Sequence, residues 1–250
     1  MADVLLQVEG LRKRFGGVAA TDNLSLDVRA GEVHALIGPN GAGKTTFITQ
    51  LMGELTPDGG TVRFAGQSLD GLDTAARVHL GIARTFQITQ TLDEETALAN
   101  VALTIQAHQG HSFRFWKNAA NDPSLNEPAR RLLADAGLAA RSNVSVRDMS
   151  HGEHKQLELA MALASEPRLL LLDEPMAGLG LSESRQMIDA LKALKGRIAI
   201  LLVEHDMDAV FALADRISVL VYGKVIATGT AQEIQADPQV RAAYLGEGDA

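Results

Sequence analysis

The residues with the clearest capacity for chemistry form one continuous stretch, Gly38-Pro39-Asn40-Gly41-Ala42-Gly43-Lys44-Thr45. It follows an apolar run that ends at Ile37 and leads into a segment of helical character. Glycines let the backbone curl so that several N–H groups point inward, and a following helix adds its positive end to the same spot, which suits an anion. Lys44 can reach the β- and γ-phosphates of a nucleotide, and the Thr45 hydroxyl is placed to ligate Mg²⁺. The stretch is therefore predicted to be a phosphate-binding P-loop rather than a glycine-rich turn with a chance lysine.

Two adjacent carboxylates, Asp173 and Glu174, follow the apolar run 169–172. A buried strand that ends in two carboxylates places them at the sheet edge where the P-loop also opens. Asp173 suits the coordination sphere of Mg²⁺, and Glu174 suits the polarisation of a water for in-line attack on a γ-phosphate. The alternative is that both only cap the segment that follows, since acidic residues favour helix starts.

Two further polar residues are weaker candidates. His205 follows the apolar run 198–203 and comes directly after Glu204, so it also lies at the carboxyl end of a strand, where it could hydrogen-bond a γ-phosphate and hold the attacking water. Taken alone, such a histidine is more often structural. Gln87 offers a neutral amide that can bind both a metal and a water, although an isolated glutamine would carry no meaning.

The hydrophobic pattern places these residues on an α/β framework. Alternating apolar and polar residues over 5–28, broken at Gly16-Gly17, predict antiparallel strands and a turn. Uninterrupted apolar runs are typical of strands that a parallel sheet buries on both faces. Three such runs follow the strand of the P-loop: 169–172, 198–203 and 217–221. Helices are predicted over 45–55, over 94–106 and from the motif at 149–153 to about 165, and a turn at 57–60 leads into a strand over 61–64.

Composition limits the class of protein. The chain of 250 residues is long enough for one large domain, or for a domain with a subdomain. It has no cysteine, so nothing suggests disulfides or a thiolate metal site, and we expect a reducing interior. The net charge of −8 opposes loose binding to nucleic acid or to an anionic lipid surface. No apolar run approaches the roughly 20 residues of a spanning helix and the N-terminus lacks a signal pattern, so we expect a soluble chain.

The motif that settles the class is Met149-Ser150-His151-Gly152-Glu153, ahead of an amphipathic segment. It resembles the signature of ATP-binding cassette (ABC) ATPases, usually Leu-Ser-Gly-Gly-Gln. The P-loop, Gln87, the signature, the two carboxylates and His205 occur in that family's order, and the resemblance covers about residues 5–246. It implies an α/β P-loop NTPase fold: a RecA-like parallel-sheet core, an N-terminal antiparallel β-subdomain and an inserted α-helical subdomain. The expected organisation is one nucleotide-binding domain over 1–250, with the helical subdomain at about 88–165 and a C-terminal extension at about 230–250.

The resemblance also implies roles for individual residues. Phe15 sits where the family places an aromatic ring against adenine, and Gly178-Leu179-Gly180 sits where it places the dimer-contact loop. The expected catalytic residues are Glu174, His205 and Gln87, and the expected Mg²⁺ ligands are Thr45, Gln87 and Asp173. The residues expected to bind ATP are Phe15, Gly38, Asn40, Gly41, Ala42, Gly43, Lys44, Thr45, Thr46, Ser150 and Gly152.

The signature departs from the family pattern at two positions, His151 and Glu153, and the dimer loop ends in Gly180, where many relatives have Asp. Ser150 and Glu153 also form a capping-box pattern, in which the serine accepts from the backbone N–H three residues on and the glutamate reaches back. The hydrogen of the serine hydroxyl is then expected to stay free for a phosphate oxygen. His151 either touches the nucleotide of the partner or replaces glycine where the backbone permits it.

In this family two such domains face each other head to tail, so that each ATP lies between the P-loop of one chain and the signature helix of the other. A monomer should then bind ATP but hydrolyse it poorly. The segment after Gln87 is expected to lie near the docking site of a transmembrane subunit. Phe113, Phe115 and Trp116 belong to a loop-rich insertion over 108–127, which either shapes that dock or packs within the helical subdomain.

A finer resemblance rests on four segments: 81–87, Ser150-His151-Gly152, Ala177-Gly178-Leu179 and 237–246. They are similar to the ATPases of branched-chain amino acid uptake systems and of their urea and amide relatives. This implies transmembrane permease subunits, a second ABC ATPase chain in a heterodimer (with a homodimer as the alternative) and, indirectly, a periplasmic solute-binding protein. The chain would lie at the cytoplasmic face of the inner membrane, reaching it only through protein partners, with no nucleic acid bound.

Three other classes compete with an uptake ATPase. An exporter ATPase of the lipopolysaccharide type is close in fold and in its C-terminal extension. A soluble cassette protein of translation or DNA repair usually carries two cassettes or long coiled-coil arms and, for nucleic acid, a basic surface. A P-loop kinase is disfavoured by the signature helix and by His205.

Overall fold

The computed structural model describes residues 3–85, 91–109 and 122–245, and these residues separate into two compact units. The first unit consists of Met1–Ile82, Arg168–Glu174 and Lys195–Ala250, and the second of Ala83–Pro167 and Pro175–Leu194. Gln87, Phe113, Phe115 and Trp116 lie outside the described residues.

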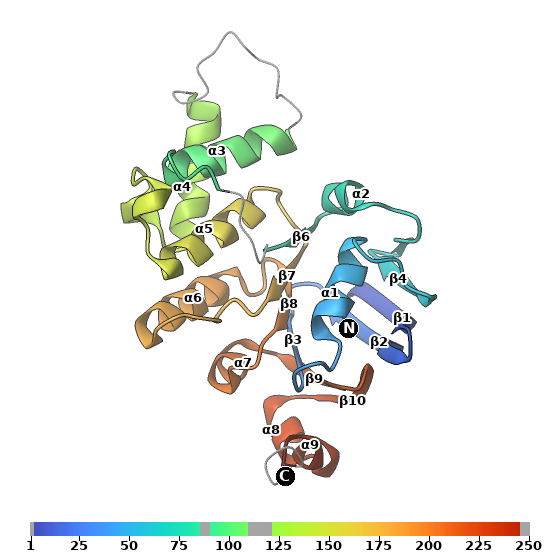
Figure 1. Cartoon of the computed structure of the whole chain (residues 1–250). Coiled ribbons are helices and arrows are strands. Elements are labelled where there is room, and N and C mark those ends of the chain that lie inside the picture. Colours follow the sequence, from blue (N-terminus) through green and yellow to red (C-terminus); the bar gives the residue numbers. More distant parts are fainter. Residues whose placement is uncertain (1–2, 86–90, 110–121, 246–250) are drawn as a thin grey trace. The chain divides into compact units, whose positions relative to one another are not determined.

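The first unit begins with an antiparallel sheet of strand order β2-β1-β4-β5 (Figure 1). Its strands are β1 (Val4–Phe15), β2 (Val18–Arg29), β4 (Gly59–Phe64) and β5 (Gln67–Ser68). The predicted pair of strands over 5–28 is confirmed as β1 and β2, which turn at Gly16 with a φ of 57°. The turn predicted at 57–60 is shorter than expected, because Gly59 pairs with Arg12 and already belongs to β4.

A second sheet has the strand order β10-β9-β3-β8-β7-β6. Its strands are β3 (Val33–Ile37), β6 (Ile82–Arg84), β7 (Leu169–Asp173), β8 (Ala199–Val203), β9 (Arg216–Val221) and β10 (Lys224–Gly229). Strands β7, β8, β3 and β9 run parallel, as their apolar runs predicted, and every residue of β3, β7 and β8 is buried. Strand β10 is antiparallel to β9 and was not predicted, nor was β6, within which the boundary between the two units falls.

Helix α1 (Lys44–Met52) follows the P-loop strand directly. It ends three residues before the predicted end at 55, because Gly53 takes the left-handed conformation that closes many helices. Phe47, Ile48 and Leu51 of α1 pack into a core shared with β1, β2, β7 and β8. The other helices of this unit are α2 (Thr74–His79), α7 (Met207–Leu213), α8 (Ala231–Ala236) and α9 (Pro238–Leu245).

A second core of this unit lies behind the P-loop strand. Ala35 and Ile37 of β3 pack with Val219 of β9, Ile234 of α8 and Val240 of α9. A pocket of about 510 Å³ opens beside Ile37 and is lined mainly by apolar side chains of α7, α8 and α9. Figure 1 shows β10, α8 and α9 following one another toward the C-terminus.

The second unit is helical. Its elements are α3 (Ala97–His108), α4 (Pro123–Asp135), η2 (Ala139–Arg141), η3 (Val146–Asp148), α5 (His151–Leu163) and α6 (Leu181–Leu194). The loop predicted over 108–127 is wrong from residue 123 onward, because Asp122 caps α4 by accepting from the backbone N–H of Ser124, and Pro123 occupies the first turn, where its missing N–H costs nothing.

In the described part of the chain, no helix combines the length and the apolar character needed to cross a bilayer.

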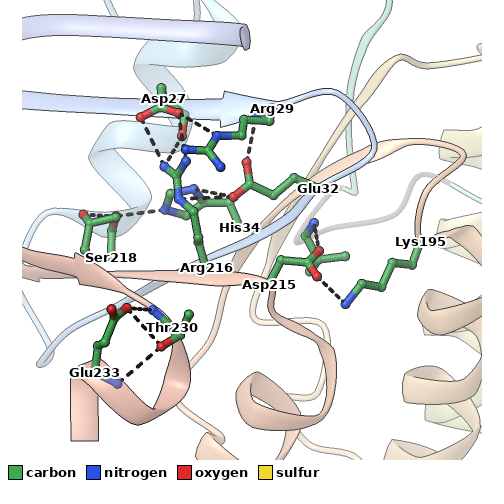
Figure 2. A network of polar contacts seen from close by, with 12 residues as sticks. Asp27, Arg29, Glu32, His34, Lys195, Asp215, Arg216, Ser218, Thr230 and Glu233 are labelled. Carbon is green, nitrogen blue, oxygen red and sulfur yellow. Dashed lines mark hydrogen bonds and ion pairs between the residues drawn. The ribbon is translucent and has the colours of Figure 1, made fainter. Parts of the chain in front are cut away.

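A partly buried polar network joins β2, β3 and β9 of the first unit (Figure 2). Arg216 contacts the carboxylate of Asp27 with two nitrogens, at 3.0 and 3.1 Å, and its Nε lies 3.3 Å from Oε1 of Glu32. Nε2 of His34 lies 2.8 Å from the hydroxyl of Ser218, and its Nδ1 has no hydrogen-bond partner among the described residues. Burial, followed by the charge of Arg216, lowers the pKa of His34 from 6.5 to about 4.

The free energy of unfolding is therefore expected to fall as the pH drops from about 6.5 to 4. In that interval the unfolded chain takes up a proton at His34 that the folded chain does not bind, and the whole effect is on the order of 3 kcal/mol. Denaturant unfolding of the wild type and of His34→Gln, each at several pH values, measures the effect, because the carboxylates of Asp27 and Glu32 are common to both proteins. Parallel pH profiles of the two proteins would contradict it.

Candidate nucleotide site

The register of the parallel sheet brings the candidate residues of the first unit to one edge. Val203 of β8 pairs with Leu36 of β3 on one side and with Asp173 of β7 on the other. The P-loop begins two residues after Leu36, and His205 follows two residues after Val203. The carboxyl ends of three adjacent strands therefore carry the phosphate-binding loop, the paired carboxylates and the histidine, which is where ligands bind in open α/β sheets.

Two P-loop glycines sit where a side chain would not fit. Gly43 precedes α1 with a φ of 105°, and a Cβ there would lie 2.0 Å from the carbonyl oxygen of Ala20. A Cβ on Gly38 would lie 2.1 Å from the carbonyl oxygen of Leu220. The loop is further tied to the β9–β10 turn by a hydrogen bond of 2.9 Å from the Gly223 N–H to the carbonyl of Ala42. The loop is therefore packed against β2 and β9 so closely that only glycine fits at these two positions.

Lys44 points back into its own loop. Its Nζ donates to the carbonyl of Gly38 at 2.6 Å and to that of Pro39 at 3.1 Å. Burial lowers the pKa of this ammonium, while the charges of Glu174 and Asp173 act in the opposite direction. The ammonium thus lies inside the anion-binding loop, where the negative charges of Glu174 and Asp173 stabilise its positive charge.

Glu174 and His205 approach each other at the sheet edge. Oε1 of Glu174 lies 3.7 Å from Nδ1 of His205, and the two side chains are 36% and 60% exposed, so both are open to solvent. The backbone of Glu174 has a φ of 51°, which a non-glycine residue rarely adopts, and its N–H is held by the carbonyl of Val203 at 2.8 Å. Such strained residues cluster at active sites. Asp173 is the last residue of β7 and is buried.

Sequence reasoning missed the role of Glu204. Its side chain is fully buried, and its Oε2 accepts from the backbone N–H groups of His205 at 2.9 Å and Asp206 at 3.2 Å. The carboxylate thereby fixes the backbone that presents His205. The signal available in the sequence was a glutamate placed between an apolar run and a candidate histidine.

Except for Ala42, the other ATP-binding candidates of the first unit are at least partly accessible. Phe15 ends β1 with its ring half exposed, 5.8 Å from the ammonium of Lys13. Asn40, Gly41 and Thr45 are exposed and Thr46 is half buried, whereas Ala42 packs into the core.

Ser150 and Gly152 lie on the second unit, at the N-terminus of α5. The predicted capping box is present: the Ser150 hydroxyl accepts from the Glu153 N–H at 3.2 Å, and Glu153 accepts from the Ser150 N–H at 2.8 Å. Glu153 also forms an ion pair with Arg141, whose Nε lies 2.6 Å from Oε1. A glutamine at this position would bind Arg141 less strongly, because it carries no charge. His151, at the first position of the helix, is exposed and close to Gly178.

One expectation about Ser150 differs from the structure. Its hydroxyl hydrogen is not free but is donated to Oε1 of Glu183 at 3.1 Å. Glu183 was not among the predicted residues, because it lies 33 positions away on another helix, α6.

A curled anion-binding loop, a lysine inside it and two consecutive carboxylates at the end of the neighbouring strand β7 define a P-loop nucleotide-hydrolysing enzyme as the class of protein.

Comparison with known proteins identifies the family. The sequence pattern of the ABC transporter family matches residues 21–177, and that of the branched-chain amino acid ATP-binding cassette transporter matches residues 224–250. The chain is 36% identical to the high-affinity branched-chain amino acid transport ATP-binding protein LivG of Salmonella typhimurium, over 99% of this chain and all of that protein. It is also 36% identical to BraF, of the same description, from Pseudomonas aeruginosa, with the same coverage.

Solved structures agree with this family. The ADP conformation of an ATP-binding cassette of an ABC transporter superposes with a TM-score of 0.85 at 30% identity, covering 98% of this chain and 99% of that one. A nucleotide-free cassette superposes with a TM-score of 0.84, also at 30% identity, over 97% and 99% of the two chains. The chain belongs to the ABC transporter family, as an ATP-binding subunit that hydrolyses ATP, and the predicted fold class is confirmed.

Proposed function

We propose that this chain powers an importer of branched-chain amino acids, or of related small polar or amide solutes, from the cytoplasmic face of the inner membrane. The observation that carries the proposal is the likeness, over nearly the whole length of both chains, to ATPases named for branched-chain amino acid transport. The match of residues 224–250 to a segment described for the same transporters supports it independently of the P-loop. An exporter ATPase of the lipopolysaccharide type is the alternative.

The proposed hydrolysis uses the residues at the sheet edge. Glu174, open to solvent, accepts a proton from the water that attacks the γ-phosphorus of ATP in line. His205, 3.7 Å from Glu174, orients that water or the γ-phosphate. Lys44 exchanges the carbonyls of Gly38 and Pro39 for phosphate oxygens, which are stronger acceptors for an ammonium because they are charged.

A Mg²⁺ ion fits the donors that this edge provides. The Thr45 hydroxyl and the Asp173 carboxylate are hard oxygen ligands, and no group of three His, Cys, Asp or Glu side chains among the described residues could form a protein cage. This donor set suits a cation that takes its remaining ligands from phosphate and water, and when bound the ion neutralises charge on the phosphate oxygens. Gln87 remains a proposed ligand outside the described residues.

The second unit is proposed to act on the nucleotide of another ATPase chain. Ser150 and Gly152 start α5, whose N-terminal N–H groups favour an anion. In the proposed assembly a second ABC ATPase, different from this chain, pairs with it head to tail. Transmembrane permease subunits bind the pair, and a periplasmic solute-binding protein delivers the solute to them. Phe15 is proposed to stack against adenine, since its half-exposed ring ends β1, and the neighbouring strand β2 lies against the P-loop through the carbonyl of Ala20.

Transport by the reconstituted complex tests this proposal. Co-expression of the chain with the permease and ATPase subunits encoded beside it, followed by reconstitution into vesicles, should give ATP-dependent uptake of labelled leucine that requires the binding protein and fails with Glu174→Gln. An excess of unlabelled isoleucine or valine should reduce the uptake of labelled leucine, whereas an excess of a basic amino acid should not. ATP hydrolysis without uptake of any such solute, together with movement of lipid-linked saccharide outward, would replace the importer by the exporter.

A further inference from the structure

The carboxylate of Glu183 lies against the start of α5. It is near the N-terminus of α6, and its two oxygens take different partners: Oε1 accepts from the Ser150 hydroxyl at 3.1 Å, and Oε2 accepts from the Gly180 N–H at 3.1 Å. The backbone N–H of Gly152 also favours the ionised form of this carboxylate and so contributes to lowering its pKa. A Cβ on Gly152 would lie 2.6 Å from the carboxyl carbon, so only glycine leaves room for this contact.

These contacts use the same groups that the proposed mechanism assigns to a γ-phosphate. A serine hydroxyl has one hydrogen, so Ser150 cannot donate to Glu183 and to a phosphate oxygen at the same time. One of the two acceptor positions of the hydroxyl oxygen is used by the Glu153 N–H. When a γ-phosphate approaches α5, the hydrogen of the Ser150 hydroxyl is therefore already donated to Glu183.

Charge opposes the approach as well. The hydrogen bonds from Gly180 and Ser150 lower the pKa of Glu183, so its carboxylate is ionised at neutral pH. A phosphate oxygen within hydrogen-bond distance of Ser150 would then lie next to this negative charge, which is unfavourable at such short range. The Glu183 side chain therefore has to move away from Ser150 before a phosphate oxygen can bind there.

We propose that Glu183 is a positioning residue that holds Ser150 and Gly152, and that the γ-phosphate bound to the partner chain must displace it when the two ATPases close. The inference rests on the proposed function, because it requires the paired site. The contact between Glu183 and Ser150 competes with ATP for the Ser150 hydroxyl. The apparent Kd of the pair for ATP therefore equals the intrinsic Kd divided by the fraction of molecules in which this hydroxyl is not bound to Glu183.

Glu183→Gln should therefore make the pair close at lower ATP concentration. Glutamine keeps the size of the side chain and one carbonyl oxygen for the Gly180 N–H, but it removes the charge and weakens the contact with Ser150. We expect the ATP concentration for half-maximal pairing to fall roughly threefold to tenfold. The KM for ATP should fall in parallel, with a much smaller change in kcat.

The experiment compares two proteins that cannot hydrolyse ATP, Glu174→Gln and Glu174→Gln/Glu183→Gln, each as the full chain with its co-expressed ATPase partner. Sedimentation velocity across an ATP titration gives the fraction paired. Asp189→Asn in the same background is the matched control, because Asp189 is an exposed carboxylate on the same helix. Melting temperatures of the ATP-free proteins report any loss of structure, which would weaken pairing rather than tighten it.

Three outcomes separate the inference from the proposed function. Pairing at lower ATP concentration with Glu183→Gln, but not with Asp189→Asn, supports the inference. Pairing at the same or a higher ATP concentration overturns it and leaves the proposed function standing. If ATP pairs neither protein, the paired site itself is contradicted, and the inference falls with it.

Discussion

Glu174→Gln should lower ATP turnover by roughly 10²–10³-fold or more while ATP still binds. The carboxylate is open to solvent, lies 3.7 Å from Nδ1 of His205 and is held at a strained backbone position. Glutamine has nearly the same shape, so the site should keep its geometry and lose only the group that accepts the proton. Because ATP would persist, the ATPase pair should stay closed. Steady-state phosphate release and the fraction paired in ATP measure the two effects.

Glu166→Gln is the matched control for this prediction. Glu166 is also an exposed glutamate, and its backbone has a φ of 49°, close to the 51° of Glu174. The same substitution at a residue with a similar φ should leave turnover unchanged. Near-wild-type turnover by Glu174→Gln would show that another group accepts the proton.

Lys44→Ala should weaken ATP binding by roughly 10–100-fold, which corresponds to the loss of one or two charge-assisted hydrogen bonds. The ammonium lies inside the P-loop, with only the carbonyls of Gly38 and Pro39 as hydrogen-bond partners among the described residues. Its removal takes away the one positive side chain within the loop, although the backbone N–H groups remain. Calorimetric titration with ATP and Mg²⁺ gives the affinity directly.

Lys224→Ala serves as the control for Lys44→Ala, since Lys224 is an exposed lysine on β10 whose ion pair with Asp22 is at the surface. Both variants lose one positive charge, so a general effect of net charge would appear in both. An unchanged affinity in Lys44→Ala, with an unchanged melting temperature, would mean that the backbone of the loop alone holds the phosphates.

The sequence predicted the parts of the fold that depend on local pattern. Strands β3, β7 and β8 are buried on every residue, so their apolar runs carried an unambiguous signal, and the cap of α5 follows from the spacing of Ser150 and Glu153. Strand β10 was missed because its residues are mostly half exposed and do not alternate. The start of α4 was missed because its Asn and Pro content resembles a loop, although Asp122 and Pro123 form a regular helix start.

The site was predictable only as far as it follows strand ends. Asp173, Glu174 and His205 lie within two residues of the ends of buried strands, so topology alone brings them to the P-loop edge. The contact between Glu183 and Ser150 joins two helices and depends on how α5 and α6 pack, which no local pattern encodes. The network of His34 and Arg216 is likewise formed by residues 182 positions apart on neighbouring strands, β3 and β9.

The segment after residue 223 takes part in the core behind the P-loop. Ile234 and Val240 share that core with Ala35 and Ile37, the residues that lead into Gly38. Cutting the chain before β10, or exchanging the last residues for those of another transporter ATPase, would uncover the back of the strand that presents the phosphate-binding loop. In a chimaera of this chain, β3, β9 and the C-terminal helices α8 and α9 should therefore all come from the same parent protein. An affinity tag should be added only after α9.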